Sequence, residues 1–342
     1  MVILYVIYSS GVDVTGPMLG KAKTSAKVEV DFRGSGTTYS LFRIRHVYFN
    51  LDWGKSALLV GQTWHPLYGD VAPEILNLNM GAPYQPFSRA PQIRYRFTSN
   101  NFMLTAAAIW QSQYLSVGPK TNKPGETSTR KSQEFMKKSC VPEFYLGVDY
   151  KRPGLIAGAG LHVSSITPRT QSETEDAVYF VNERVTGISG EAHVKYTKEN
   201  WLVSAKTVLG TNLTQTSTVG GYGITSIDEV TGKQQYSPLR TSSTWVNVAY
   251  GKKWRPALFF GYLKNLGATK EVPYGALGTG TTLDQLFTGT AELTYNIPHW
   301  KFGAEYSLCN AWYGDEFDAK AKAINSHSIL NHRIVLVALF QF

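Results

Sequence analysis

Residues 331–342, at the end of the chain, read NHRIVLVALFQF. Alternate positions place five apolar side chains on one face, namely Ile334, Leu336, Ala338, Phe340 and Phe342. Arg333 and Gln341 lie on the other face. This alternation predicts a β-strand with one apolar face. Because an exposed apolar strand edge promotes aggregation, the strand must either be buried in a soluble core or lie against lipid.

The composition is compatible with both surroundings. The 342 residues are 43% hydrophobic, 13% aromatic and 17% charged, with a formal net charge of +9. No apolar run approaches the roughly 20 residues that a membrane helix needs, the longest being residues 2–8 and 334–340. A membrane barrel alternates lipid-facing and lumen-facing residues, so its mean hydropathy resembles that of a soluble protein.

The same alternation recurs along the whole chain. In FYLGVDYK, residues 144–151, Phe144, Leu146 and Val148 share one face. The pattern predicts about fifteen strands, many of them of the ten or so residues that a tilted strand needs to cross a bilayer. Their expected ranges are 3–15, 23–33, 39–52, 56–64, 91–99, 101–111, 143–151, 155–165, 184–197, 201–210, 242–252, 254–265, 286–296, 299–311 and 329–342.

The links between these strands alternate in length. Short turns such as DWGK, KRPG and GKKW alternate with long segments rich in Gly, Ser, Thr and Pro. The expected long loops are 65–90, 112–142, 166–183, 211–241, 266–285 and 312–328. Short turns at one end and long extracellular loops at the other are typical of outer-membrane barrels. The prediction is therefore an all-β fold, a single transmembrane antiparallel β-barrel domain over residues 1–342.

The strand count raises a question about the first strand. If the last strand ends on the periplasmic side, the first of fifteen strands begins outside the cell, whereas bacterial single-chain barrels have even strand numbers. In addition, residues 1–11, MVILYVIYSSG, do not resemble a secretory signal. We expect the chain to be N-terminally truncated, with residues 1–8 starting the second strand; a miscounted strand is the alternative.

Two segments resemble the DcaP-like outer-membrane porins. They are LFRIRHVYFNLDWGKSALLVGQTWHPLY, residues 41–68, and NMGAPYQPFSRAPQIRYRF, residues 79–97. The residues that carry the resemblance are Arg45, Tyr48, Gly61, Gln62, Thr63, Trp64, Arg89, Pro91, Gln92 and Arg94. The likeness covers the chain from about Gly11 on. It implies a bacterial outer-membrane porin that forms a homotrimer and passes small, often anionic, solutes, with about sixteen strands in the complete family member and about fifteen here.

Fixed charges on the lumen face would set ion preference. By alternation, the predicted pore-lining residues are Arg94, Arg96, Lys195, Lys206, Lys301 and Arg333, with acidic members Asp149, Glu191, Glu292 and Glu305. Arg89 joins Arg94 and Arg96 in a predicted basic cluster at the narrow zone. The basic excess favours anions. The alternative is that these charges pair across neighbouring strands and only stabilise the wall.

The loop at residues 64–89 is the predicted constriction. Its apolar side chains include Leu76, Leu78 and Met80 and would be poorly solvated on an external loop. Folding into the lumen or packing at a subunit contact would bury them, and the inward alternative is slightly favoured. The constriction residues are predicted to be Trp64, His65, Tyr84 and Phe87.

Other functions have weaker support. The loop residues His65, Asp70 and Glu74 could suggest a metal, but such side chains are usually solvated. The pair Glu191 and His193 could suggest an outer-membrane barrel enzyme, yet no serine has a suitable partner. A soluble β-sandwich for adhesion or sugar binding also remains open. We expect outer-membrane lipid and small anions as partners, no nucleic acid, no cofactor and no catalysis; whether Cys140 and Cys309 pair is left open.

Overall fold

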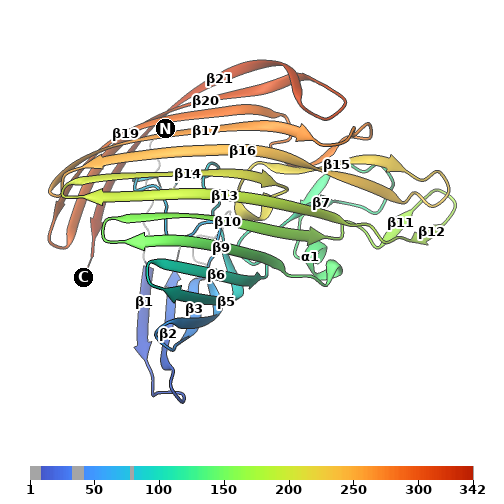
Figure 1. Ribbon diagram of the computed structural model, residues 1–342. Coiled ribbons are helices and arrows are strands. Elements are labelled where there is room, and N and C mark those ends of the chain that lie inside the picture. Colours follow the sequence, from blue (N-terminus) through green and yellow to red (C-terminus); the bar gives the residue numbers. More distant parts are fainter. Residues whose placement is uncertain (1–8, 33–41, 78–80, 342) are drawn as a thin grey trace.

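The computed structural model describes residues 9–32, 42–77 and 81–341. Within this part of the chain, one large antiparallel sheet curls around an interior (Figure 1). Fifteen long strands make up its wall: β1 (Ser9–Thr15), β2 (Lys23–Asp31), β3 (Arg43–Asp52), β4 (Ser56–Trp64), β5 (Arg89–Ser99), β6 (Phe102–Ile109), β9 (Glu143–Arg152), β10 (Leu155–Ile166), β13 (Val185–Lys198), β14 (Trp201–Thr211), β16 (Gln234–Tyr250), β17 (Trp254–Ala268), β19 (Leu283–Ile297), β20 (Trp300–Phe317) and β21 (Ala323–Phe340).

Each wall strand pairs with the next wall strand along the chain, from β1 with β2 to β20 with β21. The predicted antiparallel meander is thus confirmed, and the β-sandwich alternative is wrong. Among the described residues, β1 pairs only with β2 and β21 pairs only with β20. Residues 1–8 of the expected first strand, Leu78, Met80 and the terminal Phe342 lie outside the described part.

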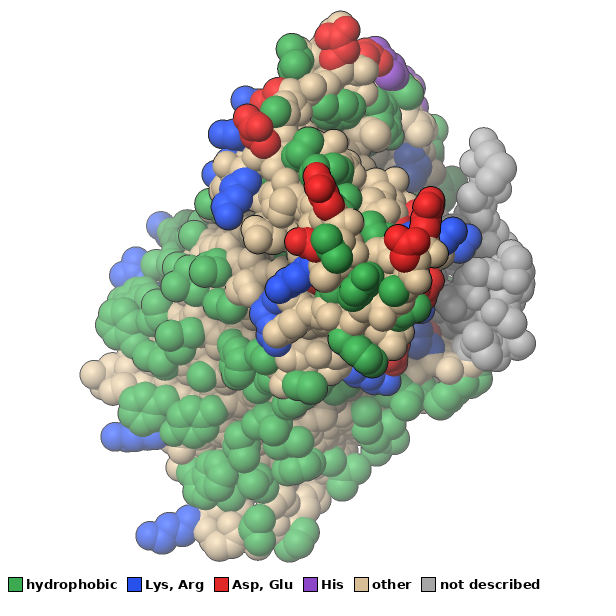
Figure 2. Space-filling model, turned by 90° about the vertical axis from the view of Figure 1, so that its right-hand side faces the viewer, with side chains coloured by type: hydrophobic (Ala, Val, Ile, Leu, Met, Phe, Trp, Pro, Cys, Tyr) green, Lys and Arg blue, Asp and Glu red, His purple; other side chains and the backbone are tan. Residues whose placement is uncertain are grey.

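The two faces of the wall have opposite character. On β5, Ile93, Tyr95 and Phe97 are 46%, 45% and 43% exposed on the outside, whereas Gln92 and Arg94 are buried on the inside. A soluble sheet would show the reverse, since it buries its apolar face. Figure 2, which faces the loop end, shows hydrophobic side chains spread over the left and lower flank and acidic side chains on the upper, loop-bearing part.

Aromatic side chains form cross-strand pairs beside the short turns. The pairs are Trp201 with Tyr250, Trp254 with Tyr295, Trp300 with Phe340 and Phe102 with Tyr150, with ring centroids 4.8, 4.6, 4.7 and 5.2 Å apart. Every one of these residues lies within three positions of a strand end. An aromatic girdle at this height is what a membrane interface favours.

The opposite end carries a small folded layer that we call the loop cap. It comprises β7 (Val117–Pro119), β8 (Thr129–Lys131), α1 (Glu134–Ser139), β11 (Gln171–Glu173), β12 (Val178–Phe180), β15 (Gly220–Ile227) and β18 (Ala276–Thr279), beside a 3-10 turn, η1 (Thr214–Thr216). Its apolar core is Phe135, Ile166, Val185, Tyr222, Ile224 and Leu277. Among the described residues, no helix is long and apolar enough to cross a membrane.

A buried ion pair joins three segments of the loop cap. Arg169 and Glu183 are both fully buried, and Arg169 Nε donates to Glu183 Oε2 at 3.0 Å. Arg169 also donates to the carbonyl oxygens of Asn122 at 2.7 Å and Gly232 at 2.8 Å. The guanidinium therefore links the segments that contain β7, β11 and β15.

Two of the expected long loops are shorter than predicted. β20 continues to Phe317 and β21 begins at Ala323, so most of residues 312–328 is strand. Likewise, β15 and the first part of β16 occupy much of residues 211–241. β20 and β21 extend into a region where polar residues such as Glu316 and Asn325 interrupt the apolar alternation that predicts a strand.

Candidate functional site

The loop between β4 and β5 turns into the barrel. His65 N donates to Ser88 O at 2.9 Å, so this inward loop, residues 65–88, leaves and rejoins the wall at neighbouring points. Between these points its described residues contact strands from β13 to β20. The segment therefore crosses the interior of the barrel, which is the inward alternative of the two that its apolar content suggested.

Glu74 anchors the loop near its tip. Its carboxylate lies 2.7 Å from Lys195 Nζ on β13 and 2.6 Å from Arg255 Nη2 on β17. Its backbone N–H donates to Asn247 Oδ1 on β16 at 2.8 Å. Hydrogen bonds between charged groups are the stronger kind, so one residue ties the loop to three wall strands.

Two wall carboxylates hold the backbone next to Glu74. Leu76 N donates to Glu292 Oε2 at 2.7 Å, and Asn77 N donates to Glu305 Oε2 at 3.0 Å. Glu292 and Glu305 lie directly opposite each other on β19 and β20. Both carboxylates are buried. The hydrogen bonds from the loop amides offset the repulsion between them.

The returning half of the loop packs on the same wall. Tyr84 is buried, bonds Thr288 Oγ1 at 2.7 Å and lies so close to Gly261 that a Cβ there would be 2.5 Å from its ring. Trp245 Nε1 donates to Gln85 Oε1 at 2.8 Å. Absence of a side chain at Gly261 thus makes room for the tyrosine.

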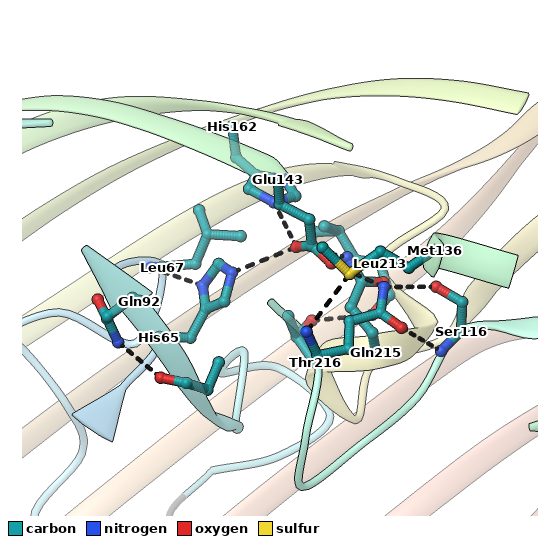
Figure 3. Close-up of polar contacts among 12 residues, drawn as sticks. His65, Leu67, Gln92, Ser116, Met136, Glu143, His162, Leu213, Gln215 and Thr216 are labelled. Atoms are coloured by element: carbon teal, nitrogen blue, oxygen red, sulfur yellow. Dashed lines mark hydrogen bonds and ion pairs between the residues drawn. The ribbon is translucent and has the colours of Figure 1, made fainter. Parts of the chain in front are cut away.

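The root of the loop meets the wall at a buried carboxylate (Figure 3). Glu143 Oε2 is 2.8 Å from His162 Nε2 and 3.4 Å from His65 Nε2. Gln111 and Gln215 donate to the same carboxylate at 2.7 and 3.1 Å. All of these side chains are buried, so the hydrogen bonds compensate the cost of placing a charge there.

His65, Glu143 and His162 have the residue types of a zinc site, but their hydrogen bonds suit an anchor. Leu67 N donates to His65 Nδ1 at 3.2 Å, which leaves the proton of a neutral ring on Nε2, facing Glu143. Coordination would need the lone pair of that nitrogen. Burial lowers the pKa of His65, against the opposing effect of Glu143, and so favours the neutral ring.

Three predicted basic residues are buried under the inward loop. The Arg89 guanidinium lies 3.7 Å from the centroid of the Trp64 ring, and Arg94 donates to Gln92 Oε1 at 2.8 Å and to Trp64 O. Lys206 Nζ donates to the carbonyl oxygens of Leu67 and Tyr68 at 2.9 and 2.8 Å. Lys206 therefore binds the loop itself, whereas Arg89 and Arg94 bind wall residues next to its root.

Aromatic rings extend this root. Trp64 stacks on Tyr68 with centroids 4.1 Å apart, and Phe87 meets Trp64 edge-on at 5.0 Å. Phe87 N also donates to Thr216 O at 2.7 Å. Three of the four predicted constriction residues, Trp64, His65 and Phe87, thus gather at the root, whereas Tyr84 lies across the lumen.

Three other predicted basic residues are partly exposed and paired. Arg96 Nη2 is 3.5 Å from Asp70, Lys195 binds Glu74, and Arg333 Nη2 is 3.3 Å from Glu305 Oε1. Lys301 is half-buried and makes no ion pair within the described part of the chain. Pairing across neighbouring strands, the alternative raised for each charge, describes Arg333, whereas Arg96 and Lys195 pair with the inward loop.

Glu191 belongs to a separate buried group. Its carboxylate accepts from Tyr145 OH at 3.0 Å and faces His193 Nδ1 at 2.9 Å. His193 Nε2 faces Asp149 Oδ1 at 2.8 Å. Both ring nitrogens meet carboxylates, and only the imidazolium can donate from both. Asp70, Arg94 and Arg96 join part of this group around a polar cavity of about 20 Å³.

Asp70 gives the inward loop a pH dependence. Burial raises the pKa of its carboxyl, but Arg96 and Lys151, whose Nζ is 2.6 Å away, lower it to about 2. Because the folded pKa lies below its ordinary 3.8, the stabilisation is complete above about pH 4 and is lost as pH falls through about 2. We expect the contribution of Asp70 to channel conductance to stay constant from pH 7 to about 4 and to produce a step below about 3. Planar-bilayer recordings of wild type and Asp70→Asn test this, since a variant that keeps the step would exclude Asp70 as its source.

Some of the site was missed from the sequence. Glu143, Arg255 and Lys151 carry important contacts and were not predicted, although alternation places Arg255 on the inner face. Conversely, Asp70 and Glu74 do not join His65 in a metal cluster, because each pairs with basic wall residues. These pairs form because the barrel brings distant residues together, and the local sequence pattern carries no information about such contacts.

Comparison with known proteins gives matches only in structure. No protein-family model and no curated protein sequence matches the chain. The outer membrane channel DcaP of Acinetobacter baumannii matches with a TM-score of 0.69 and 17% identity, over 98% of this chain and 84% of that one. OmpT of Vibrio cholerae in its trimer form matches with a TM-score of 0.54 and 12% identity, over 97% and 91%. An anion-selective porin from Comamonas acidovorans matches with a TM-score of 0.54 and 11% identity, over 96% and 87%.

At these identities the likeness establishes the fold. The predicted resemblance to DcaP-like porins is confirmed at that level, and so is the predicted fold class, a transmembrane antiparallel β-barrel of the porin type.

Proposed function

We propose that the protein is a porin of the bacterial outer membrane, through which small hydrophilic solutes diffuse passively. The observation that carries this proposal is the inward loop, which crosses a porin-type barrel and is held on both sides of its lumen. A loop held in this way narrows an aqueous passage and does not assemble a catalytic site. Transport of this kind needs neither a catalytic step nor a cofactor.

The membrane setting follows from the surface. The apolar outer face of the wall meets lipid, and the aromatic girdle marks one interface. On this proposal residues 1–342 act as one barrel domain, with short turns in the periplasm and the loop cap outside the cell. The trimer form of the V. cholerae neighbour supports a homotrimer, which chemical cross-linking in detergent would detect as a three-chain species.

Membrane insertion and conductance test whether the protein forms a channel. Folded protein added to a planar bilayer is expected to produce stepwise current increases. Protein that stays soluble without detergent and produces no steps would overturn the proposal.

We further propose a preference for anions. Within the described part of the chain, Arg89, Arg94 and Lys206 form no ion pair, while most partly exposed basic residues are paired. Buried charges are screened less than exposed ones, so these three add a positive potential beneath the constriction. The anion-selective porin among the structural neighbours supports this direction.

Arg94 and Arg96 provide the test of selectivity. Replacing both with Gln removes two positive charges beside the loop, and we expect the chloride-to-potassium permeability ratio to fall several-fold. Reversal potentials in a KCl gradient measure it. Lys120→Gln/Lys123→Gln removes the same charge from exposed loop positions and should leave the ratio unchanged. A cation-selective wild type, or an unchanged double variant, would contradict the assignment.

A further inference from the structure

The short-turn end of the barrel carries a set of exposed side chains that are all positively charged. Lys55, Arg152, Lys198, Lys252 and Lys253 lie in or beside the turns β3–β4, β9–β10, β13–β14 and β16–β17. All five are exposed and none forms an ion pair with a described residue. In a meander these turns share one edge of the sheet. We call the five residues the basic collar.

Acidic side chains are scarce at this edge. In the short turns, all of which the structure describes, Glu199 is the one exposed carboxylate. The nearby Asp52 accepts a hydrogen bond from Gly54 N at 2.7 Å. The opposite end differs, because its loops contain exposed acids such as Glu173, Asp228 and Asp318. Figure 2 shows acidic and basic side chains together at that end. The basic excess behind the net charge of +9 is therefore least offset by acidic side chains at the collar.

The collar adjoins the aromatic girdle. Trp201 directly follows the β13–β14 turn, and Trp254 directly follows Lys253. Lys253 Nζ lies 5.5 Å from the centroid of the Tyr295 ring, so its stem runs along the girdle. Girdle side chains settle at the headgroup level of a bilayer, which places the collar charges among or just beyond the phosphates.

We propose that the basic collar binds the headgroups of anionic phospholipids in the leaflet that faces the short turns. The inference rests on the proposed membrane insertion and adds a lipid preference to it. A phosphatidylglycerol headgroup carries a net negative charge and acceptor oxygens for Lys and Arg, whereas phosphatidylcholine is neutral overall. Exposed basic residues in adjacent turns suit several headgroups around the rim.

Tryptophan quenching by brominated lipids tests the proposal directly. The protein is reconstituted in phosphatidylcholine vesicles containing brominated phosphatidylglycerol or brominated phosphatidylcholine, and the girdle tryptophans report which lipid is adjacent. We expect phosphatidylglycerol to be preferred about threefold at low salt. The preference should shrink as salt approaches 1 M, where the screening length is about 3 Å.

Two matched variants assign the effect. In the collar variant, Lys55, Arg152, Lys198, Lys252 and Lys253 are all replaced by Gln, and the preference should fall to about one. In the control variant, five exposed lysines of the opposite end are replaced by Gln, namely Lys120, Lys123, Lys233, Lys270 and Lys320. The control should keep the preference despite the same change in net charge.

Each outcome is decisive. Equal quenching in the wild type, or an equal loss in both variants, would overturn the collar as a lipid site. Conductance recorded on the same preparations separates this failure from failure of the proposed function, because a collar that binds no lipid leaves wild-type channel steps intact, whereas a chain that does not insert gives none in either lipid.

Discussion

Replacing Arg169 with Met is expected to unfold the loop cap while the wall stays folded. The substitution leaves Glu183 as a fully buried charge without its guanidinium, and breaking a buried pair in this way costs about 3–5 kcal/mol. Arg169 also loses its bonds to Asn122 and Gly232, which belong to two other segments. Residues 117–131, 171–180 and 220–236 should therefore lose protection together.

Hydrogen exchange and limited proteolysis of the folded protein measure this effect. Lys137→Ala is the matched control, because Lys137 lies in the same cap but forms an exposed ion pair with Glu134 at 3.6 Å, which is worth about 0.5 kcal/mol or less. The double variant Arg169→Met/Glu183→Gln removes the unpaired charge and keeps an acceptor for Gln234 N, so it should recover part of the protection. If Arg169→Met lost no more protection than Lys137→Ala, the ion pair would not hold the cap.

Removing the inward loop is expected to raise single-channel conductance several-fold. The described residues of segment 66–87 cross the lumen, and the two ends of the segment meet where His65 N donates to Ser88 O at 2.9 Å. A short Asn-Gly turn can bridge such neighbouring strand ends. Without the loop, the polar inner faces of β13 to β20 would line a wider aqueous path.

Planar-bilayer recording gives the result, and a second deletion controls for shortening a loop as such. Residues 174–177 form the tip of the β11–β12 hairpin, where Glu173 pairs with Val178, so they can be replaced by the same turn. That variant should conduct like wild type. Unchanged conductance after deletion of the inward loop would mean that the narrowest part of the passage lies elsewhere.

The wall could be predicted closely because its signal is local. The range expected for β4, residues 56–64, is the observed Ser56–Trp64, and β14 was expected at 201–210 and spans Trp201–Thr211. Lipid on one side and polar groups on the other force alternation wherever a strand crosses the membrane. Outside the membrane nothing forces this alternation. The extensions of β20 and β21 and the small strands of the loop cap were therefore not predicted.

The site was predictable in part. Its loop was recognised by apolar residues such as Leu76 that suit an interior position. Arg94 and Lys206, which alternation predicted on the inner face, are buried. The burial of Lys206 could not be foreseen, because the loop that covers it belongs to a segment far away in the chain. The same holds for Glu143 and His162, which meet His65 only in the folded barrel.

The amino-acid sequence by itself determined the meander, the apolar exterior and the sorting of short turns from long links, since each depends on neighbouring residues and on the solvent that they face. Tertiary structure alone decided which charges meet. Glu74 reaches Lys195 and Arg255 only because the curled sheet brings its far side within reach of the loop, and electrostatic attraction acts through space without regard to separation along the chain.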